Sequence, residues 1–201
     1  MTQINKKIIF SSGGTGGHIL PAVNLMKYLS DLGYDILLIS DSRGNSFLNK
    51  NFKFKSYIVS SDTTTNKNFF KKILSIIAIF FSIFKSILII AKERPKLVFG
   101  FGGYVSFPVS FASIFFRIPL VIYENNSVLG RANKYLLPIS KKIFIGNVTP
   151  INFPEKYKYK VNQVGHILSE KIMNYVPNNS RNHDDVFSIL VLGGSQGAEI
   201  F

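Results

Sequence analysis

Short apolar runs alternate with longer helical stretches along most of the chain. Each short run ends in glycine or a polar residue, and its β-branched and aromatic side chains favour a buried strand. The predicted strands are 7–11, 35–40, 53–59, 96–101, 120–123 and 142–145, and the predicted helices are 18–32, 69–92, 104–116 and 129–137. Strands and helices in this alternation predict an α/β fold with a doubly wound parallel sheet.

The last residues repeat the pattern with which the chain opens. A strand-like run at 186–192 leads into the glycine loop GGSQG, as the first strand leads into GGTGG. Between them, 177–185 reads PNNSRNHDD, which is the composition of a linker. We therefore expect a second domain of the same type that has only begun, and the predicted divisions are a first domain at 1–165, a linker region at 166–185 and the new strand and loop at 186–201.

The composition narrows the functional classes. The absence of cysteine excludes a disulfide framework, a zinc finger and a thiolate nucleophile. Basic residues outnumber acidic ones by 24 to 11, which gives a net charge of +13, and 19 of the 24 are lysine. Base readout favours arginine, so we expect no nucleic-acid partner, whereas a lysine-rich surface attracts anionic lipid or phosphate. Biased codon usage would give the same composition. No secretory signal opens the chain, so we expect a cytoplasmic protein.

A first glycine cluster, Gly13-Gly14-Thr15-Gly16-Gly17, lies between a strand and a helix that starts near His18. Glycines allow positive φ angles and a close approach of backbone to ligand, and the helix start offers N–H groups to an anion. The loop therefore predicts a phosphate-type ligand. It lacks the lysine of a Walker A loop, and Ile19 breaks the dinucleotide fingerprint. Asp41, after the second strand, keeps a contact with a nucleotide ribose open.

Two further loops follow strands at the same predicted edge of the sheet. The first is GFGGYVSFP, which contains Gly102, Gly103 and Tyr104, and the second is YENN, which contains Glu124 and Asn126. Ligands of open α/β sheets bind outside the carboxyl ends of the strands, so the three loops predict one cleft. Close packing of helix on sheet is the alternative for GFGGYVSFP, and an asparagine-rich turn is the alternative for YENN.

The ordered set of motifs GGTGGH, GFGGYVSFP, YENNSVLGRANK, VGH and LGGSQGA resembles the MurG family, within glycosyltransferase family 28. The resemblance implies a GT-B architecture of two Rossmann-like domains, of which this chain covers about half. It also implies an inverting transfer of N-acetylglucosamine from UDP-N-acetylglucosamine to lipid I, giving lipid II for peptidoglycan. It implies no cofactor and no metal, and a peripheral location on the cytoplasmic side of the cell membrane.

The same resemblance implies roles for individual residues. His18 matches a histidine proposed as the general base, for which Glu124 is the other candidate, and a phosphate contact or a helix cap is the other role open to His18. The resemblance further implies that the donor is bound by Thr15, Gly16, Gly17, Asn126 and Ser195, and that the acceptor and its pyrophosphate are bound by Gly13, Gly14, Gly102, Gly103 and Tyr104.

Two departures from the family pattern leave alternatives open. Tyr123 stands where the family usually has histidine, and Ser169 stands where it has a phosphate-binding arginine. A copy that binds membrane or partners without catalysis, or a transferase with another glycolipid acceptor, would tolerate these changes.

One apolar segment, 73–91, has the length of a membrane span but carries Lys85 within it. A crossover between two strands of one sheet must return to that sheet, which argues against spanning. We expect an amphipathic helix that lies on anionic lipid, with flanking lysines at the headgroups. A helix buried on the sheet is the alternative.

Overall fold

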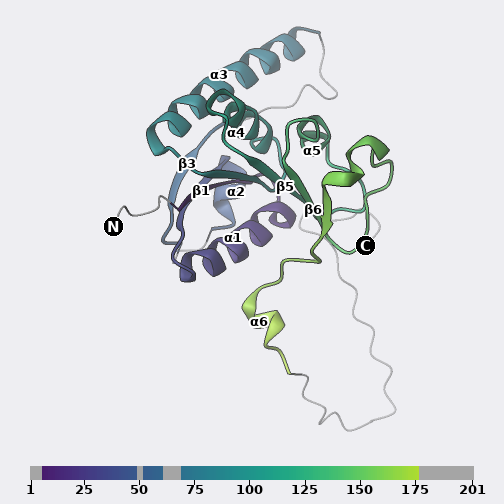
Figure 1. The fold of residues 1–201 in the computed structure, drawn as a ribbon. Coiled ribbons are helices and arrows are strands. Elements are labelled where there is room, and N and C mark those ends of the chain that lie inside the picture. The colour runs from purple at the N-terminus through teal and green to yellow at the C-terminus, as the bar shows by residue number, and fades with distance from the viewer. Residues whose placement is uncertain (1–5, 49–51, 61–68, 177–201) are drawn as a thin grey trace, which may run out of the picture.

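A computed structural model describes residues 6–48, 52–60 and 69–176, which form one α/β fold (Figure 1). Within these residues seven strands, all parallel, form a sheet in the order β3-β2-β1-β4-β5-β6-β7. The predicted α/β class is confirmed. The strands are β1 Lys7–Ser11, β2 Asp35–Ser40, β3 Lys55–Ile58, β4 Leu97–Gly100, β5 Leu120–Glu124, β6 Lys142–Ile145 and β7 Val161–Gln163.

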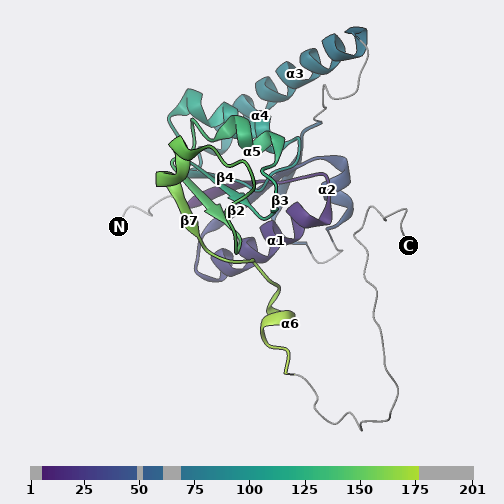
Figure 2. The same cartoon turned by 90° about the vertical axis from the view of Figure 1, so that its right-hand side faces the viewer.

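Helices cover both faces of the sheet, as a doubly wound fold requires. Figures 1 and 2 show α1 on one face and α3, α4 and α5 on the other, with α6 away from the sheet. The α-helices are α1 Gly16–Asp31, α2 Ser42–Ser46, α3 Phe69–Glu93, α4 Ser106–Ala112, α5 Arg131–Leu136 and α6 Glu170–Met173, and the 3-10 helices are η1 Ser113–Phe116 and η2 Glu155–Lys160.

Alternate strand residues supply two hydrophobic cores. Ile9, Val98 and Ile122 belong to the core shared with α3, α4 and α5. Their neighbours Phe10 and Phe99 belong to the core shared with α1. Both faces of the central strands are therefore buried, which explains why these strands read as continuous apolar runs rather than as an alternation.

An aromatic row stiffens the sheet edge where the predicted motifs lie. Phe99 and Phe101 have ring centroids 4.7 Å apart, and Phe101 lies 5.4 Å from Tyr123. Phe10 joins both phenylalanines at 5.6 Å. Phe101 and Tyr123 immediately precede the second glycine loop and Glu124, so their packing holds both loops in place.

Several elements differ from the sequence prediction. Helix α1 begins at Gly16, so the sequence prediction was two residues late and His18 lies in the first turn. The polar elements α2, η2, β7 and α6 were not predicted. Three are helices of six residues or fewer, and β7 is a three-residue polar edge strand, so none shows a hydrophobic period. Everything predicted beyond 176, namely the linker composition at 177–185, the strand at 186–192 and Ser195, lies outside the described residues.

Helix α3 turns an apolar side outward over most of its length, while Ile89 and Ile90 near its end join the core. Its buried positions include Ser75, Ser82 and Ser86, whose hydroxyls donate to carbonyl oxygens one turn earlier, at 2.7–2.8 Å. Its exposed positions include Phe81, 70% exposed, and Phe84, 59% exposed. The helix is long and apolar enough to cross a membrane by length and composition, and 28% of its most apolar window is buried. The burial expected of a core helix is therefore not found.

One end of α3 is fixed to the sheet through an ionic cluster. Glu93, at its last turn, accepts hydrogen bonds from Lys7 at 2.9 Å, and from Lys55 and Tyr57 at 2.6 Å each. Burial alone would raise the pKa of Glu93, but these three donors outweigh it and lower the pKa to about 2. The other end of the helix extends past the sheet (Figure 2).

Candidate functional site

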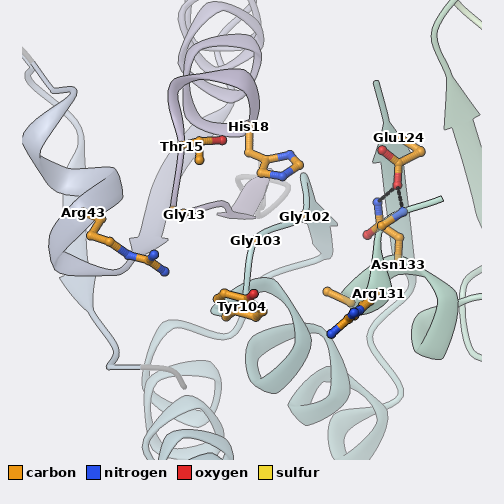
Figure 3. A pocket seen from close by; sticks show the side chains of 13 residues that line it. Gly13, Thr15, His18, Arg43, Gly102, Gly103, Tyr104, Glu124, Arg131 and Asn133 are labelled. Carbon is orange, nitrogen blue, oxygen red and sulfur yellow. Dashed lines mark hydrogen bonds between the residues drawn. The ribbon is translucent and has the colours of Figure 1, made fainter. Parts of the chain in front are cut away.

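A cavity of about 410 Å³ opens at the carboxyl ends of β1, β4 and β5, the strands that precede the three predicted motifs. Figure 3 shows its lining from α1, the two glycine loops and the start of α5. The three motifs therefore share one site, as predicted. The lining residues are Gly13, Gly14, Thr15, His18, Arg43, Gly102, Gly103, Tyr104, Glu124, Gly130, Arg131, Ala132 and Asn133.

Asp41 shapes the first glycine loop. Its Oδ1 accepts hydrogen bonds from the N–H of Gly14 at 3.0 Å and of Gly44 at 2.7 Å, and its Oδ2 lies 3.3 Å from Arg43 Nη2. Gly14 has φ of +84°, which a side chain would strain. The Asp41 carboxylate, a candidate for contact with a nucleotide ribose, thus binds protein groups instead, and it stabilises the glycine loop.

The two glycine loops touch each other. A Cβ on Gly103 would collide with the backbone of Gly13, and a Cβ on Gly102 would lie 3.0 Å from the His18 ring. Both positions also have positive φ, +78° and +90°. Glycine is therefore required twice over here, by conformation and by space, and it brings backbone groups of β1 and β4 to one wall of the cavity.

The first turn of α1 faces the cavity without a side-chain cap. Thr15 is the N-cap residue, but its hydroxyl makes no capping hydrogen bond, and the first turn contains no acidic side chain. The positive end of the helix dipole is therefore left for an external anion.

His18 is held as a neutral imidazole with a defined orientation. Burial lowers its pKa from the usual 6.5, while the charge of Glu124 and a hydrogen bond to the Phe101 backbone oppose this effect. When one ring nitrogen donates to the Phe101 carbonyl, the other carries the lone pair. A neutral, oriented imidazole that lines a cavity can accept a proton from a bound hydroxyl.

Glu124 is buried and satisfied by protein donors. Its Oε1 accepts from the backbone and side-chain nitrogens of Asn126 at 3.0 and 2.9 Å. Its Oε2 accepts from the N–H of Gly130 at 2.8 Å and from Asn133 Nδ2 at 3.0 Å. Four donors from three residues thus converge on one carboxylate, which ties the turn after β5 to the start of α5.

Two arginines in the lining were not predicted as site residues. Arg43, in α2, lies over the Tyr104 ring at 5.8 Å, and Arg131 opens α5. Figure 3 shows Arg43 and Arg131 on opposite sides of the view, with Tyr104 between them. Each side of the cavity therefore carries a guanidinium group, and that of Arg43 also pairs with Asp41. In the sequence each arginine is adjacent to a glycine, Gly44 or Gly130. This adjacency is the sequence feature by which the two arginines could have been proposed as site residues.

Eight of the twelve predicted site residues line this one cavity: Gly13, Gly14, Thr15, His18, Gly102, Gly103, Tyr104 and Glu124. Gly16 and Gly17 lie in α1 just behind it, and Asn126 is exposed with its amide on Glu124. Ser195 lies outside the described residues. Across the described part of the chain, no cluster of three or more histidine, aspartate or glutamate side chains could hold a metal ion.

Tyr123, the departure from the family pattern, joins β5 to the chain after β7. Its hydroxyl lies 3.0 Å from Asn125 Oδ1 and from the Gly165 carbonyl oxygen, and accepts from the N–H of Ile167 at 3.3 Å. His166 Nδ1 lies 2.5 Å from the same Asn125 oxygen. The tyrosine thus fixes the segment at which the chain leaves the sheet.

The strand order and the cavity at the carboxyl ends of the strands define a Rossmann-like domain of the GT-B type. Among solved structures, MurG of Acinetobacter baumannii matches with a TM-score of 0.68 at 23% identity, over 82% of this chain and 47% of that chain. At this identity the match shows a shared fold.

Sequence comparison gives the family. The profile of the glycosyltransferase family 28 N-terminal domain matches residues 8–145, and the chain belongs to this family. An N-acetylmuramyl-(pentapeptide) pyrophosphoryl-undecaprenol N-acetylglucosamine transferase of Rickettsia felis is 38% identical over 98% of the chain and 55% of its own length. The transferase of the same description from Rickettsia canadensis is 36% identical over 98% and 54%. The chain thus spans about half the length of these relatives.

Proposed function

We propose that the chain forms the acceptor-binding part of an inverting transferase that moves N-acetylglucosamine from UDP-N-acetylglucosamine to lipid I. The product is lipid II, the precursor of peptidoglycan, which supports cell-wall growth and division. The observation that carries this proposal is the single cavity with a neutral histidine, two glycine loops and two arginines, in a chain whose relatives bear the name of that reaction.

In this proposal His18 is the general base. As the 4-hydroxyl oxygen of the acceptor sugar attacks the anomeric carbon, its proton passes to the free imidazole nitrogen. The bond to the donor phosphate oxygen breaks on the opposite face, UDP takes the electron pair, and the configuration inverts. Glu124 has its oxygens occupied by four donors, so we assign it to positioning of the loop and to the electrostatics of His18.

The anionic part of the acceptor fits the cavity at the start of α1. That uncapped helix start offers backbone N–H groups, and the loops at Gly13, Gly14, Gly102 and Gly103 let a ligand approach it closely, with Tyr104 beside them. A pyrophosphate bound here would lie beside His18. We assign Thr15, Gly16, Gly17 and Asn126 to the donor side, together with Ser195 of a second domain.

The same proposal includes the division of the chain. Residues 1–165 form the acceptor domain, 166–185 connect it, and 186–201 begin a donor-binding domain. The hydrogen bonds of Tyr123 with Gly165 and Ile167 lie at the boundary between the acceptor domain and the connecting residues. They support a division there, where the chain leaves the sheet.

We place the protein peripherally on the cytoplasmic side of the membrane, where a lipid-linked acceptor resides. The support is the outward apolar side of α3, whose inward side carries serines. Exposed phenylalanines on a helix flanked by Lys71, Lys72 and Lys92 suit an interface with anionic lipid.

Replacing two outward phenylalanines of α3 tests the membrane contact. We expect the double variant Phe81→Asp/Phe84→Asp to bind vesicles at least about tenfold more weakly, because two large side chains no longer enter the interface. Vesicle flotation measures this loss. The control Tyr28→Asp/Tyr159→Asp adds the same two negative charges at exposed aromatic positions of α1 and η2 and should bind as the unchanged protein does. Equal binding by all three would contradict the membrane role of α3.

The catalytic proposal is tested by transfer of labelled N-acetylglucosamine from UDP-N-acetylglucosamine to lipid I, with and without a separately supplied second domain. Lipid II should form in the presence of both halves. A diacylglycerol acceptor in a parallel reaction distinguishes the other glycolipid transferases. If neither acceptor is glycosylated although both halves fold, the chain is the non-catalytic copy that the departures at Tyr123 and Ser169 allow.

A further inference from the structure

A groove of about 260 Å³ lies beside α1, on the face of the sheet that this helix covers. One wall is α1, from Leu20 to Lys27, and the other is Phe47 with residues 52–54, in the chain between α2 and β3. We call this hollow the α1 groove. None of the residues assigned to the transfer reaction lines it, so the groove is available for another role.

The walls of the α1 groove are preformed and largely apolar. Phe52 and Phe54 meet edge to face with their ring centroids 5.5 Å apart, and both pack against the core shared with α1. Leu20 and Phe47, at the rim, are 51% and 37% exposed. The described part of the chain therefore leaves apolar surface open within a fixed hollow, which is the usual lining of a ligand site.

The α1 groove begins next to the candidate active site. Thr15 lines the active-site cavity, and Gly16 follows it as the first residue of α1. A Cβ on Gly16 would lie 3.3 Å from the Phe47 ring and 3.6 Å from the Leu20 side chain. The rim of the groove thus reaches the backbone at Gly16, and a ligand in the cavity has to pass only this glycine to enter the groove.

Polar groups line the part of the groove that lies away from the active site. Lys27 lies two helical turns beyond Leu20, which is about 10 Å along α1. Lys53 comes from the opposite wall, and the amide of Asn24 can both donate and accept hydrogen bonds. The described residues that line the groove include no carboxylate. The groove therefore suits an extended chain that has amide groups and an anionic end.

The acceptor of the proposed function has such a chain. Lipid I carries a pentapeptide on the lactyl group of its muramoyl sugar, beside the 4-hydroxyl that His18 would deprotonate. An extended chain of five residues reaches about 17 Å, so a peptide that starts near His18 can pass Gly16 and bring its terminal carboxylate to Lys27. The lipid tail belongs on the other face of the sheet, where α3 lies (Figures 1 and 2), so peptide and tail do not compete.

We propose that the α1 groove binds the peptide of the acceptor, with the terminal carboxylate between Lys27 and Lys53 and the peptide amides beside Asn24. The proposal rests on the transfer to lipid I proposed above, and it names the residues that select among acceptors. The sugar and the pyrophosphate occupy the active-site cavity whatever the peptide is. The groove distinguishes an acceptor that carries a peptide from one that does not.

Titration of the protein with two acceptors in the same detergent micelles measures the contribution of the peptide. One acceptor is lipid I, and the other is an analogue whose lactyl group ends in a simple amide instead of the peptide. We expect lipid I to bind about tenfold more tightly, at roughly threefold for each exposed lysine beside the carboxylate. The double variant Lys27→Gln/Lys53→Gln should lose this difference and bind the analogue as the unchanged protein does. Both lysines are exposed, so the variant should fold normally.

Two further variants separate the groove from its charge. Asn24→Trp should also lose the difference between the two acceptors, because the indole fills the groove while both lysines remain. The matched control Lys156→Gln/Lys171→Gln removes the same charge from η2 and α6 and should keep the difference.

The outcomes distinguish the groove proposal from the transfer proposal. Equal binding of lipid I and the analogue by the unchanged protein would overturn the groove proposal and leave the transfer proposal standing. An Asn24→Trp variant that keeps the difference would overturn the groove proposal as well. So would a control that loses as much as the Lys27→Gln/Lys53→Gln variant, because the effect would then be general charge attraction. If the protein binds neither acceptor, the transfer proposal fails, and the groove proposal fails with it.

Discussion

His18→Ala should lower kcat for transfer to lipid I by about 10²–10⁴-fold, which is the usual contribution of a positioned general base. The variant should also lose the acidic limb of the pH profile. In the unchanged protein, burial lowers the pKa of His18 below 6.5, so the imidazole is neutral at pH 7 and activity falls only when the pH drops through that lowered value. Steady-state kinetics at pH values between about 5 and 8 would measure both the loss in kcat and the loss of the acidic limb.

Two companion variants separate proton transfer from positioning. His18→Asn keeps a side-chain donor that can reach the Phe101 carbonyl but has no basic nitrogen, so it should be as inactive as the alanine variant. Tyr28→Ala, at an exposed position of the same helix, should leave kcat unchanged. Near-normal turnover of His18→Ala would remove this histidine from catalysis, and full activity of His18→Asn would leave it a positioning role only.

Glu124→Gln should destabilise the protein by about 2–6 kcal/mol. The amide can accept through its single oxygen but presents an NH₂ group to two of the four donors that converge on Glu124, so two buried donors lose their acceptor at about 1–3 kcal/mol each. For a domain of this size the melting temperature should fall by about 4–24 °C. Thermal unfolding followed by circular dichroism measures the shift.

Glu155→Gln is the matched control for this loss. That side chain is 81% exposed and pairs with Lys158 on the surface, where an ion pair contributes little. Its melting temperature should change by less than about 2 °C. An equally small change in Glu124→Gln would mean that the turn after β5 holds without the carboxylate, and the positioning role would be wrong.

The strands and the site loops were predictable from sequence because their signals are strong and local. Central strands such as Asp35–Ser40 are nearly continuous apolar runs, and glycine clusters after Ser11 and Gly100 mark the ends of two neighbouring strands. Parallel packing then places these ends at one edge of the sheet. That step requires no long-range contact to be known in advance.

The parts that sequence did not predict depend on partners far away in the chain. Asp41 and Glu124 both looked available for a ligand, but each turns out to hold a loop through hydrogen bonds that only the folded backbone supplies. For helix α3 the sequence favoured an amphipathic helix but left burial on the sheet open as the alternative. Composition alone cannot tell which side of a helix faces the sheet, and it is the folded structure that places the serines on the inner side.

The order of the sheet has a consequence for how the candidate site is acquired during folding. The cavity takes its walls from β1, β4 and β5, which are adjacent in space, yet His18 and Glu124 are separated by most of the domain in sequence. Two parallel strands gain no pairing energy until the long connection between them has closed, which costs chain entropy first. No short segment of the chain can therefore carry a precursor of the site, and ligand binding is acquired together with the cooperative closure of the central sheet.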